Sequence, residues 1–222
     1  MLLHQYKVAI DGIEPAVLTA WCAPVADLLP GAAILDDADR AHAGRFRQQA
    51  DRDRITAARI LLRHALTGEA PEIAPEAWHF RTGPNGKPLM AEGLPKLHFN
   101  LSHAAEAVAV AVSTRHPVGI DIESIAIEDR AGIIPDMLTA REMERLAALG
   151  PHPRWREFMR IWTLKEACAK AMGLGMSYDF RRMEVAPESA AVTAAEMPVR
   201  TAATTMDCAG RPYALGVAWI DG

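Results

Sequence analysis

The chain has 222 residues, of which 50% are hydrophobic and 23% are charged, and this balance excludes a disordered chain and a fibre. Its 24 basic and 28 acidic residues give a net charge of −4, which argues against a general nucleic-acid binder. No apolar run approaches the roughly 20 residues of a membrane helix. Three scattered cysteines predict neither a disulfide framework nor a zinc site, so we expect a cytoplasmic protein. From the charge and the apolar runs we expect no nucleic-acid or membrane partner.

The first distinctive segment is rich in arginine. Seven Arg and two Asp lie between Arg40 and Arg63, so this stretch is strongly basic within an acidic protein. Residues 53–66 have the apolar period of an amphipathic helix, with Arg52, Arg59 and Arg63 on a separate face. Two interpretations stay open: a solvated helix face, or a site for a phosphate-bearing ligand, because the guanidinium fork matches phosphate oxygens.

The remaining predicted elements alternate between strands and helices. Residues 78–81 are a short strand candidate, residues 82–88 form a loop rich in turn residues, and residues 107–112 and 118–123 are predicted strands. A helix is predicted over 155–172, ended by Gly173, and a closing β-hairpin is predicted around the turn at 207–210. This order indicates an α+β fold, with a boundary near residues 113–117.

Three carboxylates are the main candidates for chemistry. Asp121 and Glu123 are two apart on a predicted strand, so they share a face at about 6.6 Å. On the predicted helix, Trp162, Glu166 and Lys170 are four residues apart and also share a face. An exposed polar face and an ordinary Glu–Lys surface pair explain these patterns without a ligand. Alternatively, three hard oxygen ligands without His or Cys suit Mg²⁺ beside a substrate phosphate.

The neighbouring Ser102 and His103 do not indicate a hydrolase. Adjacent side chains on a strand diverge, whereas a nucleophile and its base must be within about 2.6–3.2 Å of each other.

Together these motifs resemble those of the 4′-phosphopantetheinyl transferases, of the longer type that activates surfactin synthetase. The resemblance lies in four motifs: Gly86-Lys87-Pro88, Phe99-Asn100-Leu101-Ser102-His103, Val118-Gly119-Ile120-Asp121-Ile122-Glu123 and Trp162-Thr163-Leu164-Lys165-Glu166-Ala167-Cys168-Ala169-Lys170. The arginine-rich stretch from Arg45 to Arg63 also fits. The matched region spans residues 45–180, and the first and last 40 residues carry little recognisable signal.

The resemblance implies a fold and an activity. The fold is a pseudo-dimer of two similar α+β halves with the active site in the cleft between them, here residues 1–113 and 114–222. The activity is Mg²⁺-dependent transfer of 4′-phosphopantetheine from coenzyme A to a serine of an apo acyl, aryl or peptidyl carrier protein. The product is adenosine 3′,5′-bisphosphate. Because shorter relatives assemble this cleft from separate subunits, a chain of this length is expected to be a monomer.

The resemblance also assigns roles to individual residues. The metal ligands, for Mg²⁺ or Mn²⁺, are Asp121, Glu123 and Glu166. The catalytic groups are Glu166, as the favoured base for the serine hydroxyl, Lys170 at the phosphate, and Glu142 as an alternative base. The residues that bind coenzyme A are Arg47, Arg54, Lys87, Pro88, Asn100, Ser102 and His103. The first half thus carries nucleotide contacts and the second half carries the metal.

Two other functions are compatible with the sequence. A binding module of the same fold would hold coenzyme A or a carrier protein without transfer, although the matched catalytic positions are intact. An Mg²⁺-dependent nucleotide hydrolase would release phosphate without an acceptor protein.

Overall fold

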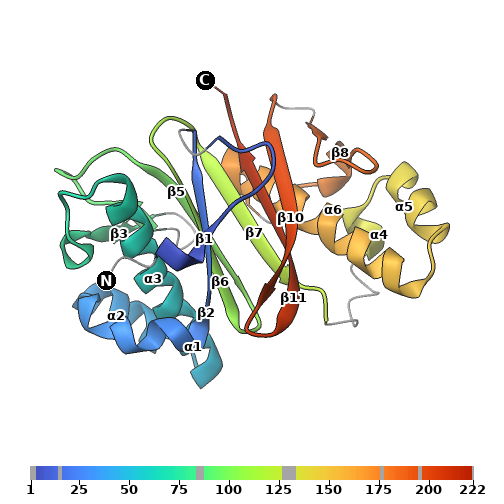
Figure 1. Ribbon diagram of the computed structural model, residues 1–222. Coiled ribbons are helices and arrows are strands. Elements are labelled where there is room, and N and C mark those ends of the chain that lie inside the picture. The colour runs from blue at the N-terminus through green and yellow to red at the C-terminus, as the bar shows by residue number, and fades with distance from the viewer. Residues whose placement is uncertain are drawn as a thin grey trace.

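The computed structural model describes residues 4–14, 17–83, 88–126, 134–175, 178–194 and 197–221. Two antiparallel sheets face each other, and a long helix covers the outer side of each (Figure 1). The strands are β1 (Lys7–Val8), β2 (Thr19–Pro24), β3 (Phe80–Thr82), β4 (Pro88–Met90), β5 (His98–Ala104), β6 (Ala107–Ser113), β7 (Val118–Ser124), β8 (Met183–Val185), β9 (Val192–Ala194), β10 (Arg200–Cys208) and β11 (Arg211–Trp219). The α-helices are α1 (Val25–Leu28), α2 (Asp37–Gly44), α3 (Gln49–Glu69), α4 (Ile134–Met137), α5 (Ala140–Ala147) and α6 (Pro151–Met172), and short 3-10 helices include η2 (Leu29–Ile34), η3 (Pro75–Ala77) and η5 (Phe180–Arg182).

The structure confirms an α+β fold and the long predicted elements. Helix α3 begins four residues before the predicted 53–66 and continues through Gly68 to Glu69. Helix α6 begins one turn earlier than predicted and ends where expected, because Gly173 adopts a left-handed φ of 72° that terminates it. Among the described residues, no helix is long and apolar enough to cross a bilayer.

The two halves of the chain share one order of elements. The first sheet has the order β1-β2-β6-β5, and the second has the order β10-β11-β7. In each half a first strand (β2 or β7) precedes the long helix, and a hairpin follows (β5–β6 or β10–β11). The last hairpin strand pairs with the first strand in both sheets. Strands β5 and β7 are therefore edge strands, and they pack against each other where the sheets meet.

Residue alternation separates three layers of core. On β6, the valines at 108, 110 and 112 pack under α3, whereas the alanines at 107, 109 and 111 face the second sheet. On the second sheet the large side chains of Ile120, Ile122, Leu215 and Val217 face those alanines. Small residues opposite large ones fill the space between the sheets, as in other packed sheet pairs.

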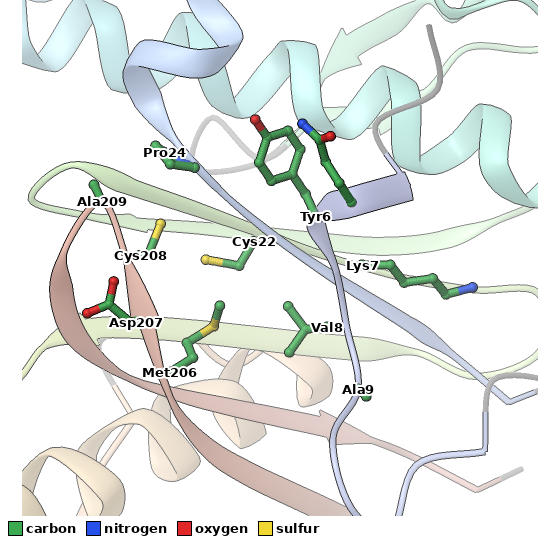
Figure 2. Close-up of a pocket in the computed structure, with 11 residues that line it drawn as sticks. Tyr6, Lys7, Val8, Ala9, Cys22, Pro24, Met206, Asp207, Cys208 and Ala209 are labelled. Atoms are coloured by element: carbon green, nitrogen blue, oxygen red, sulfur yellow. The ribbon is translucent and has the colours of Figure 1, made fainter.

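Two cysteines lie at one margin of this central layer. Cys22 on β2 and Cys208 at the end of β10 are both buried, and their side chains point toward each other (Figure 2). They line a surface pocket with residues from both ends of the chain.

Glycines let α6 lie unusually close to the second sheet. A Cβ atom on Gly119 of β7 would stand 2.0 Å from the backbone oxygen of Ala167. A Cβ atom on Gly216 of β11 would stand 2.6 Å from the backbone of Thr163. No methyl group fits at either distance, so the glycine of the Gly-Ile-Asp motif sets how near α6 can approach β7.

We predict that Gly119→Ala lowers the free energy of unfolding by at least about 2 kcal/mol, because the new methyl group must push α6 off the sheet. Urea denaturation measures this loss. Gly44→Ala is the matched control, because it also replaces a glycine with alanine. Gly44 lies in helix α2, and a Cβ atom there would meet nothing within 4 Å. It is expected to be neutral or slightly stabilising. Equal effects of the two substitutions would contradict the close approach.

Candidate active site

Asn100 joins the two edge strands. Its side chain is buried on β5, and its Oδ1 accepts a hydrogen bond of 3.1 Å from the backbone N–H of Ile120 on β7. The two strands form no regular ladder, so this bond satisfies a buried backbone donor that would otherwise have no partner. It fixes Asp121, the next residue on β7, against β5.

Asp121 lies at the centre of the site. The residue is only 3% exposed. Its Oδ1 accepts hydrogen bonds from Ser102 Oγ at 2.8 Å and from Lys170 Nζ at 2.6 Å. Its Oδ2 is buried and has no hydrogen-bond partner among the described residues. One carboxylate therefore links β5, β7 and α6, and one of its oxygens remains available to a ligand.

Lys170 supplies the positive charge of this cluster. Besides Asp121, its ammonium donates to Ser102 Oγ at 3.3 Å and to the carbonyl oxygen of Ile120 at 3.2 Å. It also lies 3.4 Å from Glu166 Oε2. Burial alone would lower the pKa of Lys170, but the two carboxylates outweigh burial and raise it. Lys170 is therefore an ammonium at neutral pH.

Glu166 is the carboxyl whose ionisation this environment disfavours. Burial and the nearby charge of Asp121 raise the pKa of its carboxyl to about 7, although Lys170 opposes the shift. Glu123 is less buried, and its Oε1 accepts a hydrogen bond of 3.2 Å from Trp162 Nε1 on α6. The predicted sharing of faces is confirmed: Ile120 and Ile122 enter the central core, while Asp121 and Glu123 point toward α6.

The donor set fits a hard divalent cation. Among the residues in the described ranges, no three His, Cys, Asp or Glu side chains are grouped closely enough to form a ready-made metal site. However, Asp121 has an orphaned buried oxygen, and burial and the charge of Asp121 raise the pKa of Glu166, so a cation between them would stabilise both ionised carboxylates. Asp121, Glu123 and Glu166 offer only oxygen ligands, which Mg²⁺ prefers. Lys170 is the cation that balances them here.

One basic side chain of α3 reaches the β5–β6 turn. Arg54 of α3 donates to the carbonyl oxygen of Ala105, in the β5–β6 turn, at 3.1 Å, and it pairs with Asp51. His103 is exposed while its neighbour Ser102 is buried, so the two side chains diverge as predicted. Desolvation by the surrounding protein lowers the pKa of His103, and the charges of Arg54 and Lys170 lower it further.

The other predicted coenzyme A contacts are less closely placed. Arg47 is exposed just before α3. Pro88 begins β4 and is half-buried in the β3–β4 hairpin, whose Phe80 packs edge-to-face on Phe99 of β5. Lys87 lies outside the described residues. The structure thus joins Asn100 and Ser102 to β7 at Asp121, and it places His103 where the charges of Arg54 and Lys170 act on it. Among the described residues, neither Arg47 nor Pro88 contacts that cluster.

Known proteins resemble both halves of the chain. The profile of the 4′-phosphopantetheinyl transferase superfamily matches residues 117–218, and the profile described as 4′-phosphopantetheinyl transferase, N-terminal, matches residues 19–115. The chain is 33% identical over 178 residues to the 4′-phosphopantetheinyl transferase HetI of Nostoc sp., which covers 79% of this chain and 70% of that protein. The chain belongs to the 4′-phosphopantetheinyl transferase superfamily.

Two further relatives match over shorter shares of their length. The 4′-phosphopantetheinyl transferase psf-1 of Bacillus pumilus is 38% identical over 139 residues, which are 63% of this chain and 58% of that protein. A phosphopantetheinyl transferase of Thraustochytrium sp. is 30% identical over 189 residues, which are 76% of this chain and 65% of that protein. The matches to these two relatives thus span less than two thirds of their length.

Glu142, the alternative base, lies in the core of the second half. It is fully buried and ion-paired at 2.5 Å with Lys165, which is fully buried too. Its Oε2 also accepts from the backbone N–H of Thr139, and its Oε1 accepts from that of Val185, both at 2.8 Å. All these bonds hold α5 and β8 onto α6. Glu142 therefore has a structural role here.

Lys165 is the structural residue that the motif did not reveal. Its ammonium also donates to the carbonyl oxygens of Met137 at 2.9 Å and Phe180 at 3.1 Å. Although Lys165 precedes Glu166 in sequence, it points into the core while Glu166 faces the site. For its partner Glu142 the sequence did hold a signal. The spacing of Thr139 and Glu142 is typical of a capping box, which indicates that the Glu142 carboxylate binds backbone at the start of a helix.

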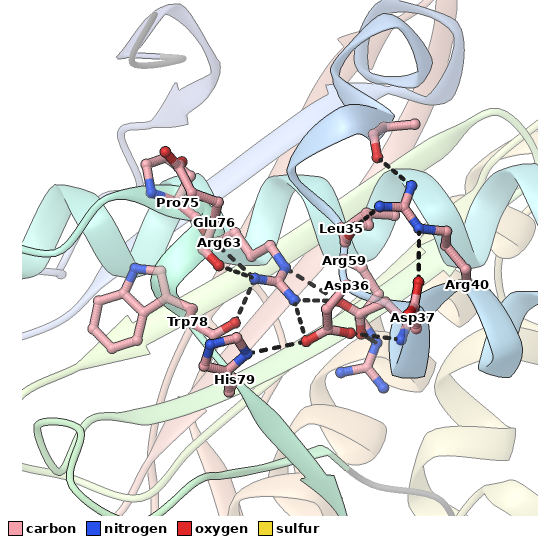
Figure 3. A network of polar contacts seen from close by, with 12 residues as sticks. Leu35, Asp36, Asp37, Arg40, Arg59, Arg63, Pro75, Glu76, Trp78 and His79 are labelled. Atoms are coloured by element: carbon pink, nitrogen blue, oxygen red, sulfur yellow. Dashed lines mark hydrogen bonds and ion pairs between the residues drawn. The ribbon is translucent and has the colours of Figure 1, made fainter.

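The arginine cluster corrects both sequence interpretations at Arg59 and Arg63. Arg63 is fully buried, with Nη2 at 2.6 Å from Asp39 and 3.0 Å from Asp36, and Nη1 bonded to backbone oxygens that include Pro75 (Figure 3). Arg59 pairs with Asp39 at 3.4 Å. These arginines form neither a solvated face nor a phosphate site, because acidic residues of the preceding segment neutralise them inside the first half.

We predict that Glu166→Gln stabilises the protein more at pH 8 than at pH 5, measured with a chelator present. The folded-state pKa of about 7 lies above the ordinary value of 4.5, so the wild type loses stability as pH rises between these values. Glutamine removes that loss. The gain in unfolding free energy is expected to be roughly 1–3 kcal/mol larger at pH 8. A gain independent of pH would refute this electrostatic description.

We predict that Lys165→Met lowers the unfolding free energy by roughly 3–5 kcal/mol, because it leaves the Glu142 charge buried and unpaired. Lys96→Met, at an exposed position, is the control and is expected to change stability by less than about 0.5 kcal/mol. Thermal or urea unfolding distinguishes the two. If Lys165→Met changes stability as little as the control does, the buried Lys165–Glu142 pair does not stabilise the fold.

Proposed function

We propose that the chain transfers 4′-phosphopantetheine from coenzyme A to a serine of an apo carrier protein and releases adenosine 3′,5′-bisphosphate. The observation that carries this proposal is the Asp121 cluster in a member of this superfamily. It joins a buried carboxylate with a free oxygen, a second carboxyl with a raised pKa and a lysine ammonium. Such a cluster suits a reaction in which negative phosphate oxygens must be held and neutralised.

We further propose that residues 1–113 and 114–222 are repeats of one unit and that coenzyme A binds where they meet. The shared order of strand, helix and hairpin supports the repeat. Ser102 and Asn100 come from the first half and Asp121 comes from the second, so the cluster needs both halves. Because one chain supplies both halves, we infer a monomer.

Asp121, Glu123 and Glu166 would hold Mg²⁺, or Mn²⁺ in its place, which supplies positive charge to the pyrophosphate of coenzyme A. Arg54 and His103 would contact phosphate oxygens farther along the nucleotide, beside the β5–β6 turn. Arg47 and Lys87 would extend this contact, and Pro88, Asn100 and Ser102 would shape the pocket wall.

The chain's own residues would move the protons. Glu166 in its ionised form accepts the proton of the carrier serine, whose oxygen attacks the phosphorus that bears pantetheine. The pyrophosphate bond breaks, and the leaving phosphate keeps the electron pair. Lys170 donates hydrogen bonds, and a proton where needed, to that phosphate. Glu142 takes no part in this scheme because its oxygens are committed to Lys165 and to two backbone amides.

The decisive experiment incubates the protein with coenzyme A, Mg²⁺ and a purified apo carrier protein, and follows the intact mass of the carrier. The carrier is expected to gain one phosphopantetheine, and a chelator is expected to prevent the gain. Binding of coenzyme A without any gain across several carrier types would instead identify a binding module. Release of phosphate without an acceptor would identify a hydrolase.

Substitutions in the cluster should separate metal binding from phosphate contact. Asp121→Asn is expected to lower the transfer rate at least about 100-fold while the fold is retained. Lys170→Ala is expected to lower turnover while Mg²⁺ still binds, measured by calorimetry. Asp37→Asn, with a fully exposed side chain, is the matched control and should transfer normally. Normal transfer by Asp121→Asn would overturn the site assignment.

A further inference from the structure

The pair of cysteines at the margin of the central layer forms a second site. Cys22 belongs to the first half and Cys208 to the second, and they lie where β2 and β10 approach each other. Their sulfur atoms face one another across the junction (Figure 2). Both side chains belong to the buried layer between the two sheets. The three cysteines are free thiols, and Cys168 is buried separately within α6.

The surroundings give a small reagent access to this pair. Both cysteines line a pocket of about 440 Å³ with Tyr6, Lys7 and Met206, among other residues. Each cysteine is about 95% buried, at 4% and 5% exposure, so a large reagent is excluded and attack must come through the pocket. None of the residues that line this pocket belongs to the Asp121 cluster. The pocket is therefore separate from the proposed transferase site.

The two thiols differ in pKa. The neighbouring Cys22 thiol lowers the pKa of Cys208, against desolvation and the nearby charges of Asp207 and Asp27. The Cys208 sulfur and burial together raise the pKa of Cys22. Thiolate is the form that attacks disulfides. Cys208 is thus the expected nucleophile, and Cys22 is the expected resolving thiol.

We propose that Cys22 and Cys208 form a reversible disulfide that clamps the two halves together. The oxidant class is a low-molecular-weight disulfide. The Cys208 thiolate attacks one of its sulfur atoms and releases one thiol. Cys22 then loses its proton, attacks Cys208 in the mixed disulfide, and releases the second thiol. Two electrons and two protons leave the protein in all, and both electrons are taken up by the reagent.

The disulfide would lie at one end of a row of paired residues across the first sheet, and Ser102, the partner of Asp121, lies at the other end. Cys22 pairs with Ala109 on β6, and Ala109 pairs with Ser102 on β5. Directly opposed residues point to the same face, and each strand step is about 4.8 Å, so the row from Cys22 to Ser102 spans roughly 10 Å. The disulfide would fix the spacing of the sheets at one end of this row, and the Ser102–Asp121 bond fixes it at the other.

The test treats the purified full chain with oxidised glutathione and maps its cysteines by mass spectrometry. A loss of about 2 Da, with one peptide pair linking Cys22 to Cys208 and restoration by a reductant, is the expected result. Closing so long a loop should also raise the melting temperature by roughly 5–10 °C. A stable glutathione adduct, a linkage between two chains, or no reaction would each overturn the proposal.

Variants assign the two roles. Cys22→Ala should stop at a glutathione adduct on Cys208, whereas Cys208→Ala should leave Cys22 unmodified. Cys168→Ala is the control and should form the same linkage as the wild type. The mapping of the wild-type protein decides the proposal even if a variant folds poorly. An adduct on Cys22 in Cys208→Ala that forms as fast as the adduct on Cys208 in Cys22→Ala would reverse the assignment.

Discussion

The site depends on how a single buried carboxylate is satisfied. One oxygen of Asp121 accepts hydrogen bonds from a hydroxyl on β5 and an ammonium on α6, and the other has no partner in the part of the chain that the structure describes. A buried charge without full compensation is costly, so it is tolerated where a ligand completes it. Lys170 provides part of the compensation, but burial and the charge of Asp121 still raise the pKa of Glu166. The surrounding fold holds the side chains of Asp121, Glu166 and Lys170 within hydrogen-bond or ion-pair distance of one another.

Two packing features bring α6 and β5 close to Asp121 on β7. Gly119 and Gly216 remove the side chains that would keep α6 away from the second sheet, so Glu166 and Lys170 can reach β7. Asn100 attaches β7 to β5, although the two strands belong to different sheets. The Lys165–Glu142 pair then fixes the outer elements of the second half to the same helix. One face of α6 serves the site, while another serves the core.

Long periodic elements and local motifs could be predicted from the sequence. The alternation in 118–123 and the four-residue spacing from Trp162 to Lys170 were strong enough to place the side chains of Asp121, Glu123, Glu166 and Lys170 on the correct faces. The partners of buried charges could not be predicted, because they come from distant segments. Nothing in residues 53–66 indicates that Asp36 and Asp39 neutralise Arg63, and this tertiary pairing decides whether an arginine faces water.

The same limit applies to the cysteines and to the short strands. Cys22 and Cys208 are scattered in sequence and gave no signal of proximity, because only the stacking of two sheets brings them together. The three-residue strands β8 and β9 carry too few residues for a visible period.

A double-mutant cycle tests the central claim most directly, namely that Ser102 of the first half and Asp121 of the second act as one unit. Unfolding free energies would be measured for the wild type, Ser102→Ala, Asp121→Asn and the double variant. The buried, charge-assisted hydrogen bond predicts a coupling energy of about 1–2 kcal/mol across the two halves. Strictly additive effects would contradict it and would mean that the two halves do not share this site.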